Sequence, residues 1–375
     1  MQSSGTPALR RFRRPDRVLV RRAPKVLLHE HLDGSLRPTT VLELARQTGY
    51  GELPEQDPER LAEWFHLGAA RGSLPLYLEG FRHTIAVLQT AEALDRAAYE
   101  FVEDMAADGV VYAETRLAPH YHTRGGLTLE AVMQALLAGL ARGTRDFGVA
   151  TGLIVCAMRN EEPALSLELA ELAVAFRDRG CVGFDLAGEE AGHPAKHHLD
   201  AFHYVQRMNF ASTIHAGESF GPESIWQALQ YCGAHRIGHG TRLIEDMALY
   251  EGRVVKLGHL AQYVLDRRIP IECCLSSNLH TGAVPAIAEH PFRAFMAGRF
   301  RVTLNTDNRL MSATTLSDEC LLAVEHFDCT LADLEKLAIN AMKSAFAHYD
   351  ERVRVIFERI KPGYAALRDE LGVAP

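Results

Sequence analysis

The chain has 375 residues, of which 47% are hydrophobic and 23% are charged, and its formal net charge is -8. These proportions are ordinary for a globular protein, and the length suits one large domain or two smaller ones. The negative charge argues against nucleic acid or an anionic membrane as the main partner. No apolar run reaches the roughly 18 residues that a membrane-spanning helix needs.

The cysteines and the first residues give two further expectations. The seven cysteines include no CxxC pair, and several lie inside apolar runs, so we expect reduced core residues and a cytoplasmic location. The first 25 residues are rich in arginine, with Asp16 as their one acid. We interpret residues 1–24 as a poorly ordered tail, with an organelle presequence as the alternative. Residues 25–375 are expected to form a single domain.

Short apolar runs alternate with longer amphipathic stretches along the whole chain. Strands are predicted at residues 25–29, 110–117, 151–158, 181–187, 211–215, 235–239, 269–276 and 301–306. Amphipathic stretches such as 127–142, 164–179 and 224–231 separate most of them. This alternation is typical of βαβ units, and eight units favour closure into an α/β fold of the (β/α)8 TIM barrel type. An open doubly wound sheet is the alternative, although no GxGxxG follows the first strand.

The connection between the first two predicted strands is much longer than the others. It has room for two or three extra helices beyond one that starts near Pro38. Within it, Tyr77, Leu78 and Phe81 share one helical face. These side chains either pack against the barrel wall or form a lid over an apolar, planar ligand, and the two interpretations have equal weight. Two closing helices are predicted at 331–349 and 351–360.

Imidazole and carboxylate groups follow several predicted strands at their C-terminal ends, where the active sites of such barrels lie. His29 and His31 end the first strand and point to one side, because their spacing is two residues. His215 ends the fifth strand, and Asp307 follows the eighth. Three imidazoles and one carboxylate suit Zn²⁺ and leave room for a water. One metal is expected, because the fourth strand lacks the lysine that usually bridges two.

Two other histidine pairs are interpreted as structural features without ligands. His120 and His122 follow Pro119 and are predicted to be a surface pair on a loop. His197 and His198 are predicted to mark the exposed start of a helix.

Glu218 and His239 are the candidate catalytic side chains. A bound Zn²⁺ lowers the pKa of its water towards about 7 and so provides hydroxide. Glu218 lies three residues after His215, and a closed apolar pocket would raise its pKa, which suits a proton shuttle. Its other interpretation, an acid at a helix N-terminus, is compatible with that role. His239 could hold the attacking water, or it could be a structural histidine near the metal.

Five motifs together resemble those of the adenosine deaminase family, in the family's order, over about residues 24–362. They are His29-x-His31-Leu-Asp33-Gly, Asp185-Leu-Ala-Gly188-x-Glu, His215-Ala-Gly-Glu218, Gly238-His239-Gly and Asn305-Thr-Asp307. The resemblance implies a (β/α)8 barrel with one Zn²⁺ held by His29, His31, His215 and Asp307. It also implies that hydroxide attacks purine C6 while Glu218 protonates N1. His239 would steer the hydroxide, and ammonia would leave.

The resemblance further implies how a purine nucleoside would bind. His31 and Asp33 would lie beside it, with Asp33 on the ribose, and the backbone of Gly188 would meet purine N3. Tyr77, Leu78 and Phe81 are similar to the apolar helix that covers the base. The family usually has a second aspartate that donates to N7, where this chain has Asn308. An asparagine amide donates at any pH, so we hypothesise that Asn308 keeps this contact.

The leading hypothesis is hydrolytic deamination of adenosine and 2'-deoxyadenosine to inosine and 2'-deoxyinosine. The alternatives are a deaminase of adenine, of a nucleotide or of a modified nucleoside, and an inactive barrel that only binds ligand. The motifs have no cluster of basic residues beside them, which disfavours nucleotides. The cytidine-type zinc deaminases carry a P-C-x-x-C signature that this chain lacks. The sequence leaves the oligomeric state open.

Overall fold

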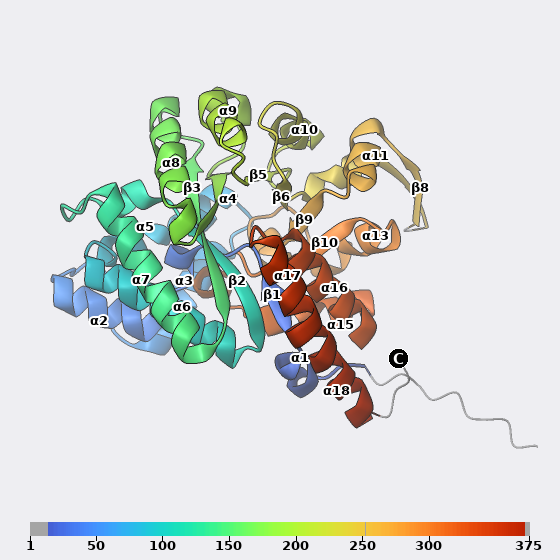
Figure 1. Ribbon diagram of the computed structural model, residues 1–375, viewed down its shortest axis with the longest axis horizontal. Coiled ribbons are helices and arrows are strands. Elements are labelled where there is room, and N and C mark those ends of the chain that lie inside the picture. Colours follow the sequence, from blue (N-terminus) through green and yellow to red (C-terminus); the bar gives the residue numbers. More distant parts are fainter. Residues whose placement is uncertain (1–13, 252, 372–375) are drawn as a thin grey trace, which may run out of the picture.

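Eight parallel strands close into a barrel in the computed structural model, which describes residues 14–251 and 253–371 (Figure 1). The strands form two four-stranded sheets, and isolated bridges between Phe184 and Ser212 and between Glu30 and Asp307 join them. The predicted (β/α)8 barrel is therefore confirmed, and the open sheet is excluded. The barrel strands are β1 (Lys25–Leu27), β2 (Val110–Leu117), β3 (Ala150–Met158), β4 (Cys181–Ala187), β5 (Thr213–Ala216), β6 (Arg236–His239), β9 (Pro270–Cys273) and β10 (Arg301–Leu304).

Helices surround the barrel and bury its outer face. All eight residues of β2 are buried, as expected for a parallel strand that is covered on both sides. The helices are α1 (Arg17–Arg22), α2 (Pro38–Thr48), α3 (Pro58–Ala69), α4 (Leu74–Leu78), α5 (Phe81–Val87), α6 (Ala91–Ala107), α7 (Leu129–Phe147), α8 (Pro163–Ala175), α9 (Leu199–Arg207), α10 (Pro222–Gln230), α11 (His259–Asp266), α12 (Leu275–His280), α13 (Phe292–Ala297), α14 (Arg309–Ser312), α15 (Leu316–Phe327), α16 (Leu331–Ser344), α17 (Tyr349–Val355) and α18 (Lys361–Leu371).

Side-chain caps explain where several of these helices begin. The hydroxyl of Thr128 accepts a hydrogen bond from Ala131 N at the start of α7, and Gly148 ends that helix with a φ of 71°. Thr315 and Thr330 form capping boxes at the starts of α15 and α16. The predicted closing helix 331–349 ends too late, because α16 stops at Ser344, and the additional helix α18 follows the predicted helix 351–360.

The long connection between β1 and β2 contains more helices than expected. Four helices, α3 to α6, follow α2 before β2 begins. The short helices α4 and α5 carry Tyr77, Leu78 and Phe81, and these three side chains line the cavity described below.

The structure differs from the expected N-terminal tail over part of its length. Residues 17–22 form α1, whose N-cap Asp16 accepts a hydrogen bond from Leu19 N. Leu19 and Val20 are buried, and Arg22 forms an ion pair of 2.6 Å with Glu370 of α18. The helix belongs to the folded body because two apolar side chains anchor it. Residues 1–13 of the expected tail lie outside the described residues.

The predicted strand 269–276 ends too late. β9 stops at Cys273, and α12 begins at Leu275. The carboxylate of Glu319 accepts hydrogen bonds from Leu275 N at 2.9 Å and Ser276 N at 3.3 Å, and so caps α12 from a distant helix. A cap supplied across the fold has no local signal in the sequence.

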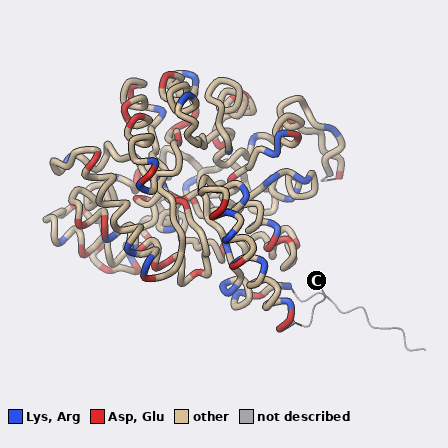
Figure 2. Tube along the Cα trace, in the orientation of Figure 1, with Lys and Arg blue, Asp and Glu red and all other residues tan. Residues whose placement is uncertain are grey.

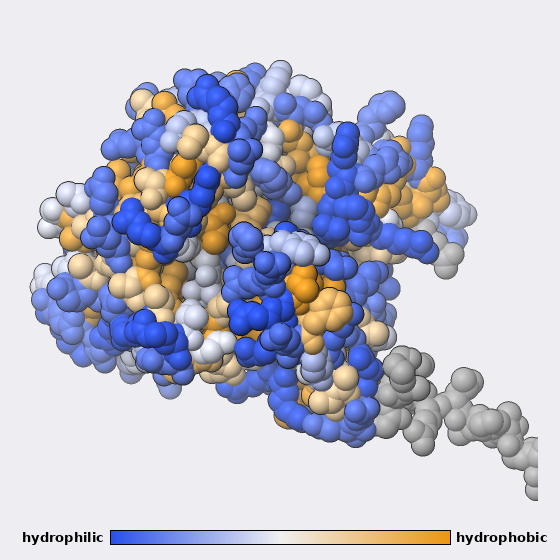
Figure 3. Space-filling view, in the orientation of Figure 1, coloured by the Kyte–Doolittle hydropathy of each residue, from blue (hydrophilic) through white to orange (hydrophobic). Residues whose placement is uncertain are grey.

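A two-stranded antiparallel hairpin, β7 (Met247–Tyr250) and β8 (Arg253–Leu257), was not predicted. Leu249, Tyr250 and Val255 are 45%, 67% and 62% exposed there, and Figure 3 shows hydrophobic colouring over this hairpin at the upper right. Elsewhere acidic and basic residues are interspersed along the trace (Figure 2). Within residues 14–251 and 253–371, no helix has the length and apolar character needed to cross a membrane.

Candidate active site

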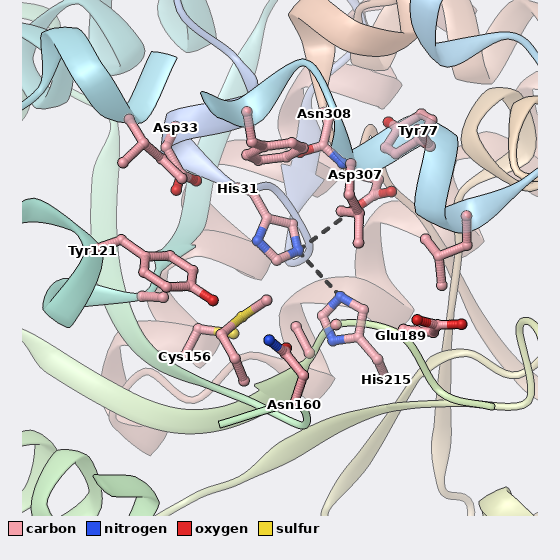
Figure 4. Close-up of a pocket in the computed structure, with 18 of the residues that line it drawn as sticks. His31, Asp33, Tyr77, Tyr121, Cys156, Asn160, Glu189, His215, Asp307 and Asn308 are labelled. Atoms are coloured by element: carbon pink, nitrogen blue, oxygen red, sulfur yellow. Dashed lines mark hydrogen bonds and ion pairs between the residues drawn. The ribbon is translucent and has the colours of Figure 1, made fainter. Parts of the chain in front are cut away.

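The four predicted metal ligands meet at the C-terminal end of the barrel. One ligand atom from each of His29, His31, His215 and Asp307 lies within 4.8 Å of the other three. His31 Nε2 is 3.1 Å from His215 Nε2 (Figure 4), and Asp307 Oδ1 is 3.3 Å from His29 Nε2. Ligand atoms about 2.0–2.1 Å from a tetrahedral Zn²⁺ would lie roughly 3.3 Å apart. The spacing therefore fits one such ion.

The hydrogen bonding of this cluster also fits a metal ion. His29 Nε2 and Asp307 Oδ1 are buried and have no hydrogen-bond partner in the described part of the chain. Buried polar atoms without partners are rare in folded proteins unless an ion or water serves them. Burial lowers the pKa of His31 well below its usual value, so this imidazole keeps a lone pair for a cation.

Two buried carboxylates orient the histidines. Glu272 Oε2 accepts from His29 Nδ1 at 2.7 Å, and Asp185 Oδ2 accepts from His215 Nδ1 at 3.1 Å. Each contact places the ring proton on Nδ1 and leaves Nε2 free to bind metal. Burial opposes ionisation of Glu272, but the charges of Arg236 and Arg116 and the hydrogen bond from His29 together outweigh it and keep the pKa of Glu272 below its usual value.

Glu218 lies beside the cluster with the protonation state that a proton donor needs. It is 4% exposed, and burial, together with the charge of Asp307, raises its pKa to about 8. Thr281 Oγ1 donates to its Oε1 at 3.0 Å, and its Oε2 lies 3.6 Å from His239 Nε2. Glu218 therefore carries a proton at neutral pH and faces the same space as the metal ligands.

The turn that carries Glu218 is held by another acid, Glu190. Its carboxylate accepts from the backbone N–H groups of four successive residues at 2.6–3.0 Å, namely Gly217, Glu218, Ser219 and Phe220. Four charge-assisted hydrogen bonds fix a loop firmly, since each is stronger than a neutral one. Glu190 thus positions Glu218 without contacting the metal ligands.

Backbone geometry at the strand ends is unusual at two site residues. His239 has a φ of 63° and Asp307 a φ of 60°, the left-handed region that residues with a Cβ rarely adopt. Gly238, which precedes His239, is required because there is no space for a side chain at this position. A Cβ there would lie 3.0 Å from His215 Cα and 3.2 Å from His29 Cε1. A larger residue would displace the ligands.

The expected substrate-binding residues all line one cavity of about 560 Å³ at the mouth of the barrel. Its walls include the metal ligands His31, His215 and Asp307, which Figure 4 labels, and both Glu218 and His239. The remaining predicted members are Asp33, Gly188, Tyr77, Leu78, Phe81 and Asn308. The structure brings every predicted site residue except His29 to this cavity, and His29 lies directly behind it in the metal cluster.

The surface pair predicted at His120 and His122 is wrong for both members, because His120 is half-buried and both its ring nitrogens are buried. The exposed helix start predicted at His197 and His198 is wrong for His198. His122 is buried, and its Nδ1 donates to Leu88 O at 3.0 Å, while its Nε2 lies 3.6 Å from Asp33 Oδ2. His198 is buried as well, and its Nδ1 bonds to Ser166 Oγ at 2.8 Å. Both side chains fill spaces between elements distant in sequence, which a local pattern does not report.

Sequence reasoning missed several residues that support the site. Glu272 lies within a predicted strand, but the residue pattern of that strand predicts only that its side chain is buried. The pattern does not predict the contact with His29. Asn278 and Ser277 lie on α12 and Thr281 just after it, beyond the predicted strand 269–276, in a stretch for which the sequence predicted no element. Ser277 Oγ donates to Asp307 Oδ2 at 2.6 Å, which fixes the orientation of that ligand.

The barrel and its cluster of three histidines and one aspartate, with a buried acid beside them, define a metal-dependent hydrolase of the (β/α)8 class. Residues 24–362 match the family model described as adenosine deaminase. The chain belongs to the adenosine deaminase family.

Curated relatives are similar over nearly the full chain. Adenosine deaminase 1 of Streptomyces coelicolor is 56% identical over 95% of this chain and 90% of its own length. Adenosine deaminase of Mycobacteroides abscessus is 55% identical over 94% of this chain and 98% of its own.

Solved structures are more distant in sequence and similar in fold. Adenine deaminase from Arthrobacter aurescens has a TM-score of 0.82 at 26% identity, and the match covers 92% of this chain and 99% of that one. Arabidopsis N6-mAMP deaminase has a TM-score of 0.78 at 28% identity, with 90% and 98% covered. Because these names cover a free base and a nucleotide, the fold alone does not define the substrate.

Proposed function

We propose that this chain catalyses the hydrolytic deamination of adenosine and 2'-deoxyadenosine to inosine and 2'-deoxyinosine with release of ammonia. The observation that carries the proposal is the position of the buried carboxyl of Glu218 in the same cavity as the ligands of the four-residue cluster. The names of the most similar relatives support adenosine as the substrate.

We propose one Zn²⁺ per chain, held by His29, His31, His215 and Asp307. Three imidazoles and one carboxylate are donors that Zn²⁺ prefers, and the spacing of their atoms fits its geometry. When bound, the ion supplies a nucleophile at neutral pH by lowering the pKa of water.

Glu218 then acts as the proton donor. Its buried carboxyl is protonated below a pH of about 8, so it can protonate purine N1 as C6 is attacked. Protonation at N1 draws electron density from C6 and makes that carbon more electrophilic. His239, 3.6 Å from Glu218, lies where it can hold the attacking oxygen.

The other cavity residues would bind the nucleoside. Asp33 would contact the ribose and the backbone of Gly188 would meet N3, while Tyr77, Leu78 and Phe81 would cover the base. Asn308 would donate to N7. Gly34 makes room for it, because a Cβ at position 34 would lie 1.9 Å from Asn308 Oδ1.

The charges at the cavity favour a nucleoside over a nucleotide. Arg82 and Arg124 line its wall, but Glu161 and Glu189 line it as well. Two acids beside two arginines offset the positive field that a phosphate group would need. An uncharged ribose suits this mixed surface better.

We also propose a cytoplasmic location. All seven cysteines are free and buried, as expected for a protein that folds in a reducing compartment.

The proposal is tested by Glu218→Gln, which keeps the size of the side chain and removes the acid. We expect kcat for adenosine to fall by at least about 10²-fold, because the proton donor is lost. Turnover is followed by the loss of ultraviolet absorbance of adenosine. Glu223→Gln, an exposed acid on α10, is the matched control and should keep the parent rate. Equal rates for Glu218→Gln and the parent would contradict the role of Glu218.

A further inference from the structure

A line of buried hydrogen-bonding groups runs from the start of α13 to His239. Phe292 N donates to His290 Nδ1 at 3.0 Å, and His290 Nε2 lies 3.1 Å from Asn278 Oδ1. Asn278 Nδ2 lies 3.0 Å from His239 Nδ1. Asn278 and Phe292 are 0% exposed, His239 is 1% and His290 is 2%. Water therefore does not compete for these contacts.

The first group in the line fixes the proton of His290. A backbone N–H can only donate, so His290 Nδ1 must accept and carries no proton. Phe292 is the first residue of α13, where a helix leaves its N–H groups unpaired, so this contact also caps the helix. A neutral ring has one proton, which must therefore be on Nε2. Burial lowers the pKa of His290 to about 3, in agreement with the neutral form.

The proton of His290 in turn fixes the amide of Asn278. His290 Nε2–H needs an acceptor, so the oxygen of the amide must face His290. The amide nitrogen then faces His239. In the opposite orientation the amide nitrogen of Asn278 would donate to His290 Nε2. Both ring nitrogens of His290 would then accept, and the ring would have no proton.

The amide of Asn278 finally fixes the proton of His239. Asn278 Nδ2 can only donate, so His239 Nδ1 accepts, and the proton of the neutral ring is on Nε2. We propose that Asn278 and His290 are positioning residues that hold His239 as its Nε2–H tautomer, with that hydrogen directed at the reacting centre.

This assignment determines what His239 can do in the reaction. Its Nε2 is 3.6 Å from Glu218 Oε2 and faces the space beside the metal ligands. An Nε2–H group donates a hydrogen bond to the attacking oxygen and does not remove a proton from it. Because Nδ1 accepts from Asn278, the ring holds one proton, on Nε2, and acts there as a donor. The consequence for turnover rests on the proposed role of His239, whereas the tautomer itself does not.

The tautomer is measured directly by nitrogen NMR of the zinc-loaded protein with ¹⁵N-labelled histidine rings. Protonated and unprotonated ring nitrogens resonate far apart, and the spectrum of His239→Gln identifies the signals of His239 by their loss. We expect an unprotonated Nδ1 and a protonated Nε2 in the parent. A proton on His239 Nδ1 in the parent would overturn the proposal. This result does not depend on any substitution of Asn278 or His290, the two residues that form the relay to His239.

Asn278→Asp tests the relay itself, because it changes an amide that donates into a carboxylate of the same size that accepts. We expect a proton on His239 Nδ1 in this variant. His290 Nε2–H keeps an acceptor, so α13 should remain capped. We also expect kcat to fall at least about 10-fold while KM changes little, since binding groups are untouched.

Asn340→Asp on α16 is the matched control, because it also places a carboxylate at a buried asparagine. It should leave the signals of His239 and the value of kcat unchanged. If Asn278→Asp keeps the parent spectrum of His239, the relay does not set the tautomer and the inference fails. If the spectrum shifts as expected but kcat is unchanged, the proposed role of His239 fails and the relay stands.

Discussion

Glu218 is the residue whose environment most directly sets the reaction. Its pKa of about 8 results chiefly from burial, and the hydrogen bond from Thr281 works in the opposite direction by stabilising the ionised form. In the proposed mechanism the protonated form of Glu218 is the active one, so activity should be lost as pH rises through this pKa. The environment therefore defines the basic limb of the pH profile.

Thr281→Val should move that limb to higher pH. Loss of the hydroxyl removes a hydrogen bond worth about 0.5–1.5 kcal/mol, which raises the pKa of Glu218 by up to about one unit. The measurement is kcat/KM for adenosine as a function of pH. Thr281→Ser keeps the hydroxyl and should keep the parent profile. A basic limb at the same pH in both variants would show that Thr281 does not tune Glu218.

Replacement of Asn308 by aspartate should introduce a second pH dependence at the residue scale. In Asn308→Asp, adenosine affinity should weaken as pH rises, because an ionised carboxylate cannot donate to N7. The parent amide donates at every pH, so its affinity should not show this trend. Binding is measured by titration of the Glu218→Gln background, in which turnover is slow. If adenosine affinity depends on pH in the same way in the two proteins, Asn308 does not contact N7.

The four residues of the metal cluster could be predicted from the sequence, and the residues that orient the side chains around it could not. His29, His31, His215 and Asp307 each follow a recognisable strand, so a local pattern places them at one end of the barrel. Asn278 and His290 act on His239 only because α12 and α13 pack behind it. Contacts of that kind depend on the tertiary fold, and no spacing in the chain records them.

At the scale of the elements, the C-terminal ends of the strands carry the metal ligands, and the backbone there must leave space for the ligand side chains. Gly238→Ala should displace His29 and His215, since the added Cβ would lie 3.0–3.2 Å from both residues. We expect less zinc per chain after dialysis and a lower kcat. Gly51→Ala is the control, because no atom lies within 4 Å of its Cβ position. Full zinc content in Gly238→Ala would show that the strands adjust instead.

The strands and helices themselves were predicted unevenly for physical reasons. β2 and β4 lie where predicted, because long buried runs have a strong signal. The end of β9 was wrong because Glu319 caps α12 from another part of the fold. The hairpin of β7 and β8 was missed because exposed strands outside the barrel lack a regular alternation of buried and polar residues.

At the scale of the whole molecule, the barrel closes through the metal ligands themselves. His31 N donates to Asp307 O at 2.7 Å, and Asp307 N donates to His29 O at 3.0 Å, where β1 meets β10. An ion bound to these three side chains would hold both sides of this seam together. Metal binding and barrel closure should therefore be coupled.

Removal of the metal with a chelator should lower the melting temperature and speed hydrogen exchange at the amides of His31 and Asp307. A ligand at 100 times its Kd stabilises a fold by about 2.7 kcal/mol, and that stabilisation would be lost. The seam between β4 and β5, where Phe184 N donates to Ala211 O at 3.0 Å, is the internal control. Uniform exchange changes at both seams would argue against local coupling.

His239 and Asp307 adopt a φ that glycine tolerates better than any other residue. Backbone strain of this kind amounts to about 1–3 kcal/mol at each position, and it is offset elsewhere in the fold. Evolution for heat resistance alone would therefore exert little pressure to keep these two side chains, whereas selection for turnover would retain them. Two libraries of variants, one selected for heat resistance and one for turnover, should differ most in the residues found at positions 239 and 307.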